Sequence, residues 1–389
     1  MTEPRKSAKK TAEPTPRKTK AQLASERRRR NYLVFSLVMV GVLSLSALAP
    51  LFTSNIQPDQ PQIQPTATTP PVLPTPISDL STIRFDNMAV SVSGLYSVAV
   101  PTGWEIGTNI VQLNEAQLTQ RNGAASSVIE ARVIQPETPI TSVEELPTFF
   151  NDAWLRSSWR DYTSWNKTGE TVVEDRYVAD FLLTRLGSQF IARQEAWTDG
   201  RWLYVVRVVT LPNASDMLRY LLNGVRQSLR VNPQIIDVPF DWQGHFDPSH
   251  EYLIRFPSTW RVTDAANGQP TSLAGEGATI RIDTVTAAVD SAEAAQQWVE
   301  TTYGAAVTSV EPVERGGAAG FAVAYQLPTL DGDTTSGYAV LLRNGDNVSV
   351  ADLRFSQPNV DLNSEVEGFE TWQQIMNSFS IWRLTSTAA

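Results

Sequence analysis

The fold is decided by the stretch Tyr96-Ser-Val-Ala-Val-Pro101-Thr-Gly-Trp104-Glu-Ile106, which returns later in the chain as Tyr252-Leu-Ile-Arg-Phe-Pro257-Ser-Thr-Trp260-Arg-Val262. Tyrosine, proline and tryptophan keep identical spacing in the two copies, with an offset of 156 residues. In each copy the apolar run predicts a strand, which the proline ends by removing a ladder donor. The tryptophan is expected to pack under the sheet corner, with a ligand platform as the alternative. The chain is therefore predicted to contain a tandem duplication.

The likeness between the copies extends well beyond this stretch. Ser127–Ile134 and Ala278–Val285 align and alternate like half-buried strands. A helix is then predicted in each copy, over Ser142–Ser157 and Ser291–Tyr303, because each begins with a capping serine followed by glutamate. The two copies therefore share an order of elements.

Each copy continues with a hairpin and ends with a helix. Asp199-Gly200 and Asn344-Gly345 separate alternating runs, and these dipeptides are the strongest short-range hairpin signal. Apolar residues spaced by three and four then predict an amphipathic helix in each copy. They are Met217, Leu218, Leu221, Leu222, Val225 and Leu229 in the first copy and Phe369, Trp372, Ile375, Met376 and Phe379 in the second. Short strands are expected over 229–231 and 379–382.

The predicted order in each copy is β-β-β-α-β-β-β-α, an α+β fold of two tandem antiparallel sheets, each covered by helices. The opening Tyr-x-x-x-x-Pro-x-x-Trp pattern, the hairpin and the closing helix resemble the PsbP/Mog1-like family, including bacterial membrane-anchored exported proteins of that type. The resemblance implies binding or assembly rather than catalysis, since the known members are photosystem subunits, a partner of a nuclear-transport GTPase and bacterial lipoproteins. It assigns no binding residues.

Charge is strongly segregated along the chain. Residues 1–30 hold eleven Lys/Arg against three Glu, whereas the whole chain has a net charge of −9. The next run, 32–52, carries no charge and would measure about 31 Å as a helix, close to the thickness of a bilayer's hydrocarbon core. We therefore predict one transmembrane helix. Its basic N-terminal flank predicts a cytoplasmic N-terminus and extracytoplasmic domains at the cell membrane.

Two alternatives concern this N-terminal region. A cleavable signal peptide ending at Ala47-Leu48-Ala49 competes with the uncleaved signal anchor, but Pro50 would then begin the mature chain. Nucleic-acid binding by the basic tail is disfavoured because prolines interrupt it and no aromatic residue is interleaved for base stacking. We expect a single-pass anchor and no nucleic-acid partner.

Residues 53–79 contain seven prolines and are predicted to form an extended stalk. The expected organisation is a basic tail over 1–31, a transmembrane helix over 32–52, the stalk over 53–79, a first PsbP-like repeat over 80–232, a linker over 233–249, a second repeat over 250–384 and a tail over 385–389.

The composition is poor in two residue types that are common in catalytic sites, cysteine and histidine. The chain has no cysteine, and its two histidines, His245 and His250, fall in the segment 241–251, at the end of the predicted linker and the start of the second repeat. A metal site there, or a calcium loop at Asp331-Gly-Asp333, is outweighed by a solvated linker and a hairpin turn. The glycine clusters match no nucleotide-binding motif. We expect no catalytic, cofactor-binding or metal-binding residues.

The candidate partner-binding residues are Trp159, Tyr162 and Trp165, which are expected in a loop after the helix and have no counterpart in the second copy. Replacing Trp159 and Trp165 by alanine is expected to weaken partner recovery while leaving the melting temperature nearly unchanged. For the aromatic cluster as a whole, core packing is favoured over a partner-binding or glycan-binding surface.

The sequence therefore predicts a membrane-anchored, extracytoplasmic, non-enzymatic binding or assembly module that recognises a protein partner near the membrane. The alternative is a cell-envelope hydrolase that acts on glycans through an unidentified carboxylate pair, which a cleft with two nearby acids would favour. A transmembrane sensor is disfavoured because the basic tail offers no output domain.

Overall fold

The computed structural model describes residues 79–384, apart from 233–237, 265, 267, 276, 361 and 363–369. The predicted basic tail, transmembrane helix and nearly all of the stalk lie outside the described residues, so these assignments stay predictions. Among the helices of the described part, none has the length and apolar character needed to span a bilayer.

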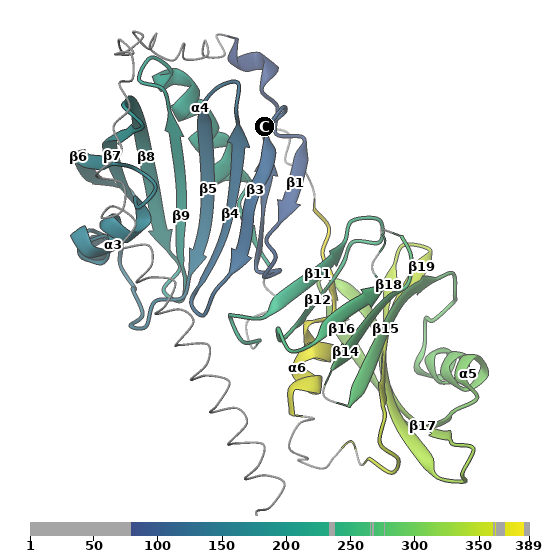
Figure 1. Cartoon of the computed structure of the whole chain (residues 1–389). Coiled ribbons are helices and arrows are strands. Elements are labelled where there is room, and N and C mark those ends of the chain that lie inside the picture. The colour runs from purple at the N-terminus through teal and green to yellow at the C-terminus, as the bar shows by residue number, and fades with distance from the viewer. Residues whose placement is uncertain are drawn as a thin grey trace, which may run out of the picture. The chain divides into compact units, whose positions relative to one another are not determined.

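The first repeat consists of two antiparallel sheets and a few short helices (Figure 1). Its elements are η2 (Leu80–Thr82), β1 (Asn87–Val90), β2 (Tyr96–Val100), β3 (Glu105–Val111), β4 (Glu115–Asn122), β5 (Ser127–Ile134), η3 (Val143–Glu145), α2 (Leu146–Phe149), α3 (Asp152–Ser158), β6 (Ser164–Val173), β7 (Arg176–Arg185), β8 (Ser188–Thr198), β9 (Leu203–Thr210), α4 (Ser215–Ser228) and β10 (Arg230–Val231). The strand orders are β1-β2-β10 and β3-β4-β5-β9-β8-β7-β6.

The second repeat has the same order of elements. They are β11 (Gln243–Asp247), β12 (Tyr252–Phe256), β13 (Arg261–Asp264), β14 (Thr271–Gly275), β15 (Ala278–Val285), α5 (Ala292–Tyr303), β16 (Ala306–Arg315), β17 (Ala318–Pro328), β18 (Thr334–Asn344), β19 (Asn347–Phe355), α6 (Glu370–Ser378) and β20 (Ser380–Ile381). Its sheets are β11-β12-β20 and β13-β14-β15-β19-β18-β17-β16. The α+β class with antiparallel sheets is confirmed, and so is the tandem duplication.

Several local predictions are confirmed. The capping box that opens the first helical stretch forms between Ser142 and Glu145, and Ser291 caps α5. Both Asx-Gly turns join long hairpin strands, β8 to β9 and β18 to β19. Trp104 and Trp260 are buried in the two cores, as the structural interpretation of the repeated pattern predicts.

Other local predictions are wrong. Five strands, not three, precede the first long helical stretch of each repeat, and four, not three, lie between that stretch and the closing helix. The helix predicted over Ser142–Ser157 is divided into η3, α2 and α3, because Phe150 leaves the helical conformation and Asn151 caps a new helix through its side chain. The predicted linker contains β11, which pairs with β12 along its whole length, so the second repeat begins before residue 250.

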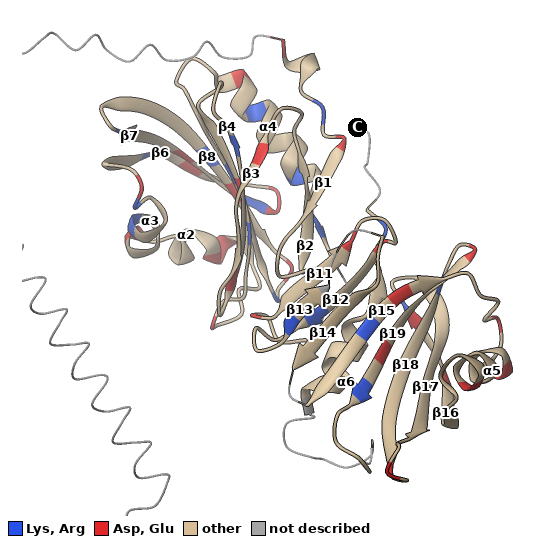
Figure 2. Cartoon of the chain, turned by 45° about the vertical axis from the view of Figure 1, so that its right-hand side comes forward, with Lys and Arg blue, Asp and Glu red and all other residues tan. Residues whose placement is uncertain are grey.

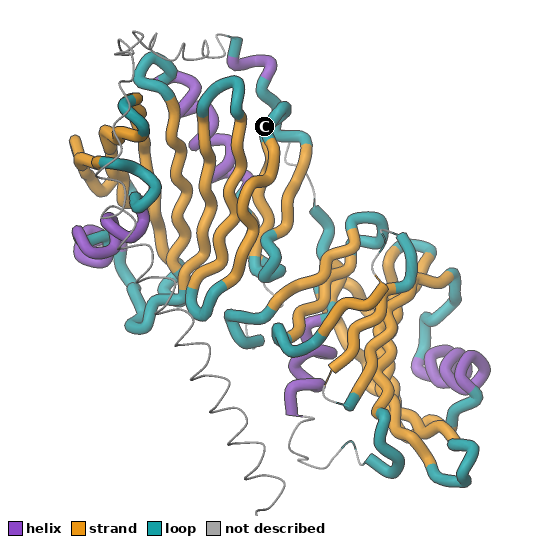
Figure 3. Tube along the Cα trace, viewed as in Figure 1, coloured by secondary structure: helices purple, strands orange, loops and turns teal. Residues whose placement is uncertain are grey.

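The seven-stranded sheet of the first repeat has apolar packing on both faces. On one face α4 and β2 contribute to a core with the inward residues of β4, β5 and β9. On the other face α2 and α3 pack over β7, β8 and β9. Figure 3 shows α4 and α3 on opposite sides of the strands. The short helices α2 and α3 leave the β3-β4-β5 half of their face uncovered by a helix.

Two adjacent glycines in the second repeat give a matched test of packing. Gly316 has a positive φ of 62°, and an added Cβ would lie 1.8 Å from the carbonyl oxygen of Ile381. Gly317 also has positive φ, but a Cβ there would meet nothing within 4 Å. We expect Gly317→Ala to cost about 1–2 kcal/mol from backbone strain. Gly316→Ala should cost more, because β20 must also move. Urea unfolding of both variants would measure this, and equal losses would contradict it.

Candidate functional site

A cavity of about 1080 Å³ lies on the uncovered half of the first repeat's large sheet. Its floor is made by alternate residues of β3, β4, β5 and β9, since successive side chains of a strand point to opposite faces. Its wall is made by the loop after β5 together with α2 and α3. The site therefore depends on the divided helix, which covers only part of the face.

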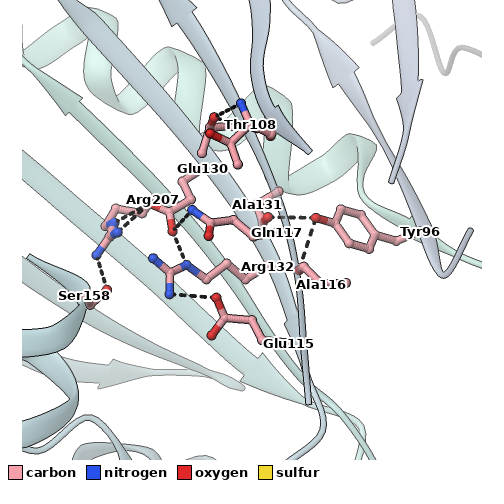
Figure 4. Close-up of polar contacts among 11 residues, drawn as sticks. Tyr96, Thr108, Glu115, Ala116, Gln117, Glu130, Ala131, Arg132, Ser158 and Arg207 are labelled. Atoms are coloured by element: carbon pink, nitrogen blue, oxygen red, sulfur yellow. Dashed lines mark hydrogen bonds and ion pairs between the residues drawn. The ribbon is translucent and has the colours of Figure 1, made fainter. Parts of the chain in front are cut away.

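The floor carries a chain of alternating charges (Figure 4). Glu130 on β5 accepts hydrogen bonds from Arg132 through one carboxylate oxygen and from Arg207 on β9 through the other. Arg132 also donates to Glu115 at 3.0 Å, and Arg207 to the hydroxyl of Ser158 at 2.8 Å. Two acids thus neutralise two guanidinium groups beside the cavity.

Glu130, Arg132 and Arg207 are buried, at 7%, 8% and 4% relative exposure. Burial alone would raise the pKa of Glu130, but Arg207 and Arg132 outweigh it and hold this pKa at about 2. Glu130 is therefore ionised at neutral pH, and its oxygens are occupied. A carboxylate in this state is a poor general acid.

The depressed pKa of Glu130 predicts a pH dependence of stability. Its pKa is about 2 in the folded chain against 4.5 for an unperturbed glutamate, so its stabilising contribution is complete above pH 4.5. That contribution should be lost as the pH falls from 4.5 towards 2. The measurement is the free energy of unfolding against pH for the wild type and Glu130→Gln. Parallel curves for the two proteins over that interval would refute the expectation.

Aromatic residues form part of the wall. Trp159 caps α3 and stacks on Arg207, with the guanidinium carbon 3.8 Å from the ring centroid. Tyr162 meets Trp159 edge to face, and Trp154 lies 5.6 Å from the guanidinium carbon of Arg132. Each of the two guanidinium groups therefore contacts an aromatic ring of the wall as well as the carboxylate of Glu130.

Of the three candidate partner-binding residues, the structure brings Trp159 and Tyr162 to the cavity lining, and Trp165 is not among the residues that line it. Trp165 lies in β6 and packs on the core beneath α3, so the prediction that it belongs to a loop is wrong. Trp159 is 1% exposed. Removing a buried indole usually costs several kcal/mol, so the burial of Trp159 favours a lowered melting temperature over the unchanged one expected from the sequence.

Sequence reasoning missed the charged floor. The signal was present in the strand Ser127–Ile134, where Glu130 and Arg132 share one face of an otherwise apolar run, and in Leu203–Thr210, where Arg207 stands among valines. Charged residues in such runs are almost never buried unless they are paired. The partner strand could not be read from the sequence, because β5 and β9 are more than sixty residues apart.

The second repeat has charges at the corresponding positions, with the signs reversed. Glu130 pairs with Arg207 across β5 and β9, and the equivalent pair across β15 and β19 is Arg281 and Asp352. Two residues on from Arg281, Asp283 stands where the first repeat has Arg132. Figure 2 shows both signs of charge on this part of the second repeat. The cavity-side face of the large sheet in the first repeat and the corresponding face in the second repeat therefore differ in their pattern of charge.

The histidines do not lie in a solvated linker. His245 is in β11, with its Nε2 3.2 Å from the hydroxyl of Thr271, and burial lowers its pKa. His250 follows β11 and has its Nδ1 3.5 Å from Asp247. Asp331 and Asp333 lie at the turn between β17 and β18. Within the described part of the chain, no group of three or more potential ligands is placed to hold a metal ion.

No protein-family model matches the chain, and no curated protein matches it. Several solved structures do. Cyanobacterial PsbP (CyanoP) from Synechocystis is 14% identical over 36% of this chain and 92% of its own, with a TM-score of 0.29. LpqN of Mycobacterium tuberculosis, described as involved in cell envelope biogenesis, is 8% identical over 36% of this chain and 83% of its own, with a TM-score of 0.19.

A third match is the immunity protein TplEi of Pseudomonas aeruginosa complexed with "L" peptide, 14% identical over 73% of this chain and 99% of its own, with a TM-score of 0.22. The duplicated sheets agree with the tandem α+β fold that the sequence predicts. At these identities and TM-scores, none of the matches determines what this chain binds.

Proposed function

We propose that this chain is a membrane-anchored, extracytoplasmic binding or assembly module that recognises a protein partner near the membrane through the cavity of its first repeat. The observation that carries the proposal is the cavity, which is walled by aromatic residues over a floor whose buried charges are already paired. Such a floor is preorganised for contact, because a ligand need not neutralise it.

The same floor supports a non-enzymatic role. A two-carboxylate hydrolase needs one acid that is protonated and another that is free to act as nucleophile or base. Glu130 has a pKa of about 2 and is held by two arginines, while Glu115 is bonded to Arg132. The two carboxylates on the cavity floor are therefore already engaged by arginines, which favours a binding role over the glycan-hydrolase alternative.

The proposal is tested by photocrosslinking in intact cells. A photoreactive residue replaces Thr148, which is exposed on α2 and lines the cavity, and in a control it replaces Leu330, which is exposed in the second repeat. We expect one discrete protein adduct from position 148 and none of the same mass from position 330. Ile110→Trp, which fills the cavity from β3, should abolish the adduct. An adduct that survives Ile110→Trp would refute recognition by the cavity.

The proposed topology has its own test. If the helix over 32–52 anchors the chain with its N-terminus in the cytoplasm, protease added to cells with a permeabilised outer barrier should digest an epitope at the C-terminus and spare one at the N-terminus. Protection of the C-terminal epitope would refute the extracytoplasmic location. Release of a chain lacking the N-terminal epitope would instead favour signal-peptide cleavage.

A further inference from the structure

One end of the cavity is acidic. Ile134, the last residue of β5, is followed by the loop that forms this end, and the carbonyl of Ile140 accepts a hydrogen bond of 2.7 Å from Thr198 at the near end of β8. Glu137, Glu144 and Glu145 line the cavity from this loop and the start of the helical stretch. All three are exposed, and Figure 2 shows acidic residues at the start of α2.

The other end is basic. Val128, near the start of β5, pairs with Arg121 on β4 and with Val209 on β9. Arg185 lies towards the same end, because it closes the hairpin whose strand β8 runs alongside Thr210. Both arginines are exposed and line the cavity. Arg160 and Asp161 also line it and offset each other.

The distance between these ends fits a short extended peptide. Val128 and Ile134 are six residues apart on one strand, which corresponds to about 20 Å at about 3.3 Å per residue. Midway, the guanidinium of Arg132 uses one nitrogen for Glu130 and one for Glu115, and Figure 4 shows no contact from the third among the residues drawn. That nitrogen offers donors to an acceptor such as a peptide carbonyl.

We infer that the cavity binds an extended segment of about six or seven residues of the partner protein, with basic side chains at one end and acidic side chains at the other. The inference rests on the proposed binding function and specifies its ligand. The basic end of the segment lies against Glu137 and Glu144, and the acidic end lies against Arg121 and Arg185. Charge complementarity of this kind fixes the orientation and register of a bound segment.

The test uses three synthetic peptides with blocked ends and the full-length protein in detergent. A segregated peptide, Lys-Lys-Ser-Ala-Ser-Asp-Asp, is compared with an alternating peptide of identical composition, Lys-Asp-Ser-Ala-Ser-Lys-Asp, and with an acidic peptide, Asp-Asp-Ser-Ala-Ser-Asp-Asp. Fluorescence anisotropy gives the Kd of each. We expect the segregated peptide to bind about tenfold or more tightly than the alternating one. Only the segregated peptide places charges of the complementary sign at both ends of the cavity.

A charge-reversal variant makes the test specific. Glu137→Lys with Glu144→Lys leaves both ends basic, so the segregated peptide should lose at least about tenfold in affinity and the acidic peptide should become the preferred ligand. The matched control is Glu174→Lys with Asp175→Lys, which changes net charge equally at an exposed turn outside the cavity lining. It should leave the preference unchanged.

The outcomes separate this inference from the proposed function. Equal affinity for the segregated and alternating peptides, or no switch in the reversal variant, overturns the segregated-charge ligand, even if the adduct from position 148 forms. An absent adduct overturns the cavity as a protein-binding site in cells, whichever peptide binds.

Discussion

Glu130→Ala is expected to destabilise the first repeat by about 3–5 kcal/mol, because it removes the one carboxylate that lies between two buried guanidinium groups. Arg207 would keep only Ser158 as a polar partner, and Arg132 would keep Glu115. An uncompensated buried charge is the costly element of this change, not the lost attraction itself. The measurement is the free energy of unfolding from urea titrations followed by tryptophan fluorescence.

The second repeat supplies the matched control. Arg281 occupies the position equivalent to Glu130, but its side chain is 63% exposed and its contact with Asp283 is 3.5 Å long. We expect Arg281→Ala to cost no more than about 1 kcal/mol, as for an ordinary surface ion pair. If the two substitutions cost the same, the assignment of Glu130 as the residue that neutralises the floor is wrong.

Trp159→Ala is expected to cost about 3–5 kcal/mol, the usual range for removing a buried tryptophan. The indole is fully covered, stacks on Arg207 and lies 5.1 Å from the ring of Phe181, so its loss leaves a void between the wall and the sheet. Trp159→Phe retains a ring and should cost less than half as much. The melting temperature and the urea midpoint of both variants measure this difference.

A control for Trp159 lies in the next strand. Trp165 is only partly buried, so Trp165→Ala should lower stability by less than Trp159→Ala. A Trp159→Ala protein with an unchanged melting temperature would contradict the packing described for α3. It would also restore the expectation, drawn from the sequence, that this residue is free to serve only in binding.

The repeated Tyr-Pro-Trp pattern was enough to predict the duplication, since its tyrosine and tryptophan are buried in the core of both copies and the backbone N–H of the tryptophan donates to the proline carbonyl in both. The strands that were not predicted are those without a clear period of two. The strand β6 is largely exposed. The strand β4 lies between the cavity and the core, and it has polar residues among its buried positions. Edge and cavity strands lack the one-sided apolar pattern that makes a strand recognisable.

The site was predictable only in part. Trp159 and Tyr162 were singled out because they are aromatic and close in sequence, and both line the cavity. The charged floor depends on the pairing of β5 with β9, which brings Glu130 opposite Arg207. Pairing between distant strands is a tertiary property, so a local pattern can indicate that a buried charge has a partner but cannot identify the partner.

The charged pairs of the two repeats have opposite signs at equivalent sheet positions. This difference has a consequence for strand pairing while the chain folds, because strands of one repeat could otherwise pair with those of the other. If β5 paired with β19 in the native register, Glu130 would face Asp352, and β15 on β9 would set Arg281 against Arg207. Like charges opposite each other on neighbouring strands are unfavourable. The inversion thus penalises a swapped, misassembled chain and lets each half recognise its own strands.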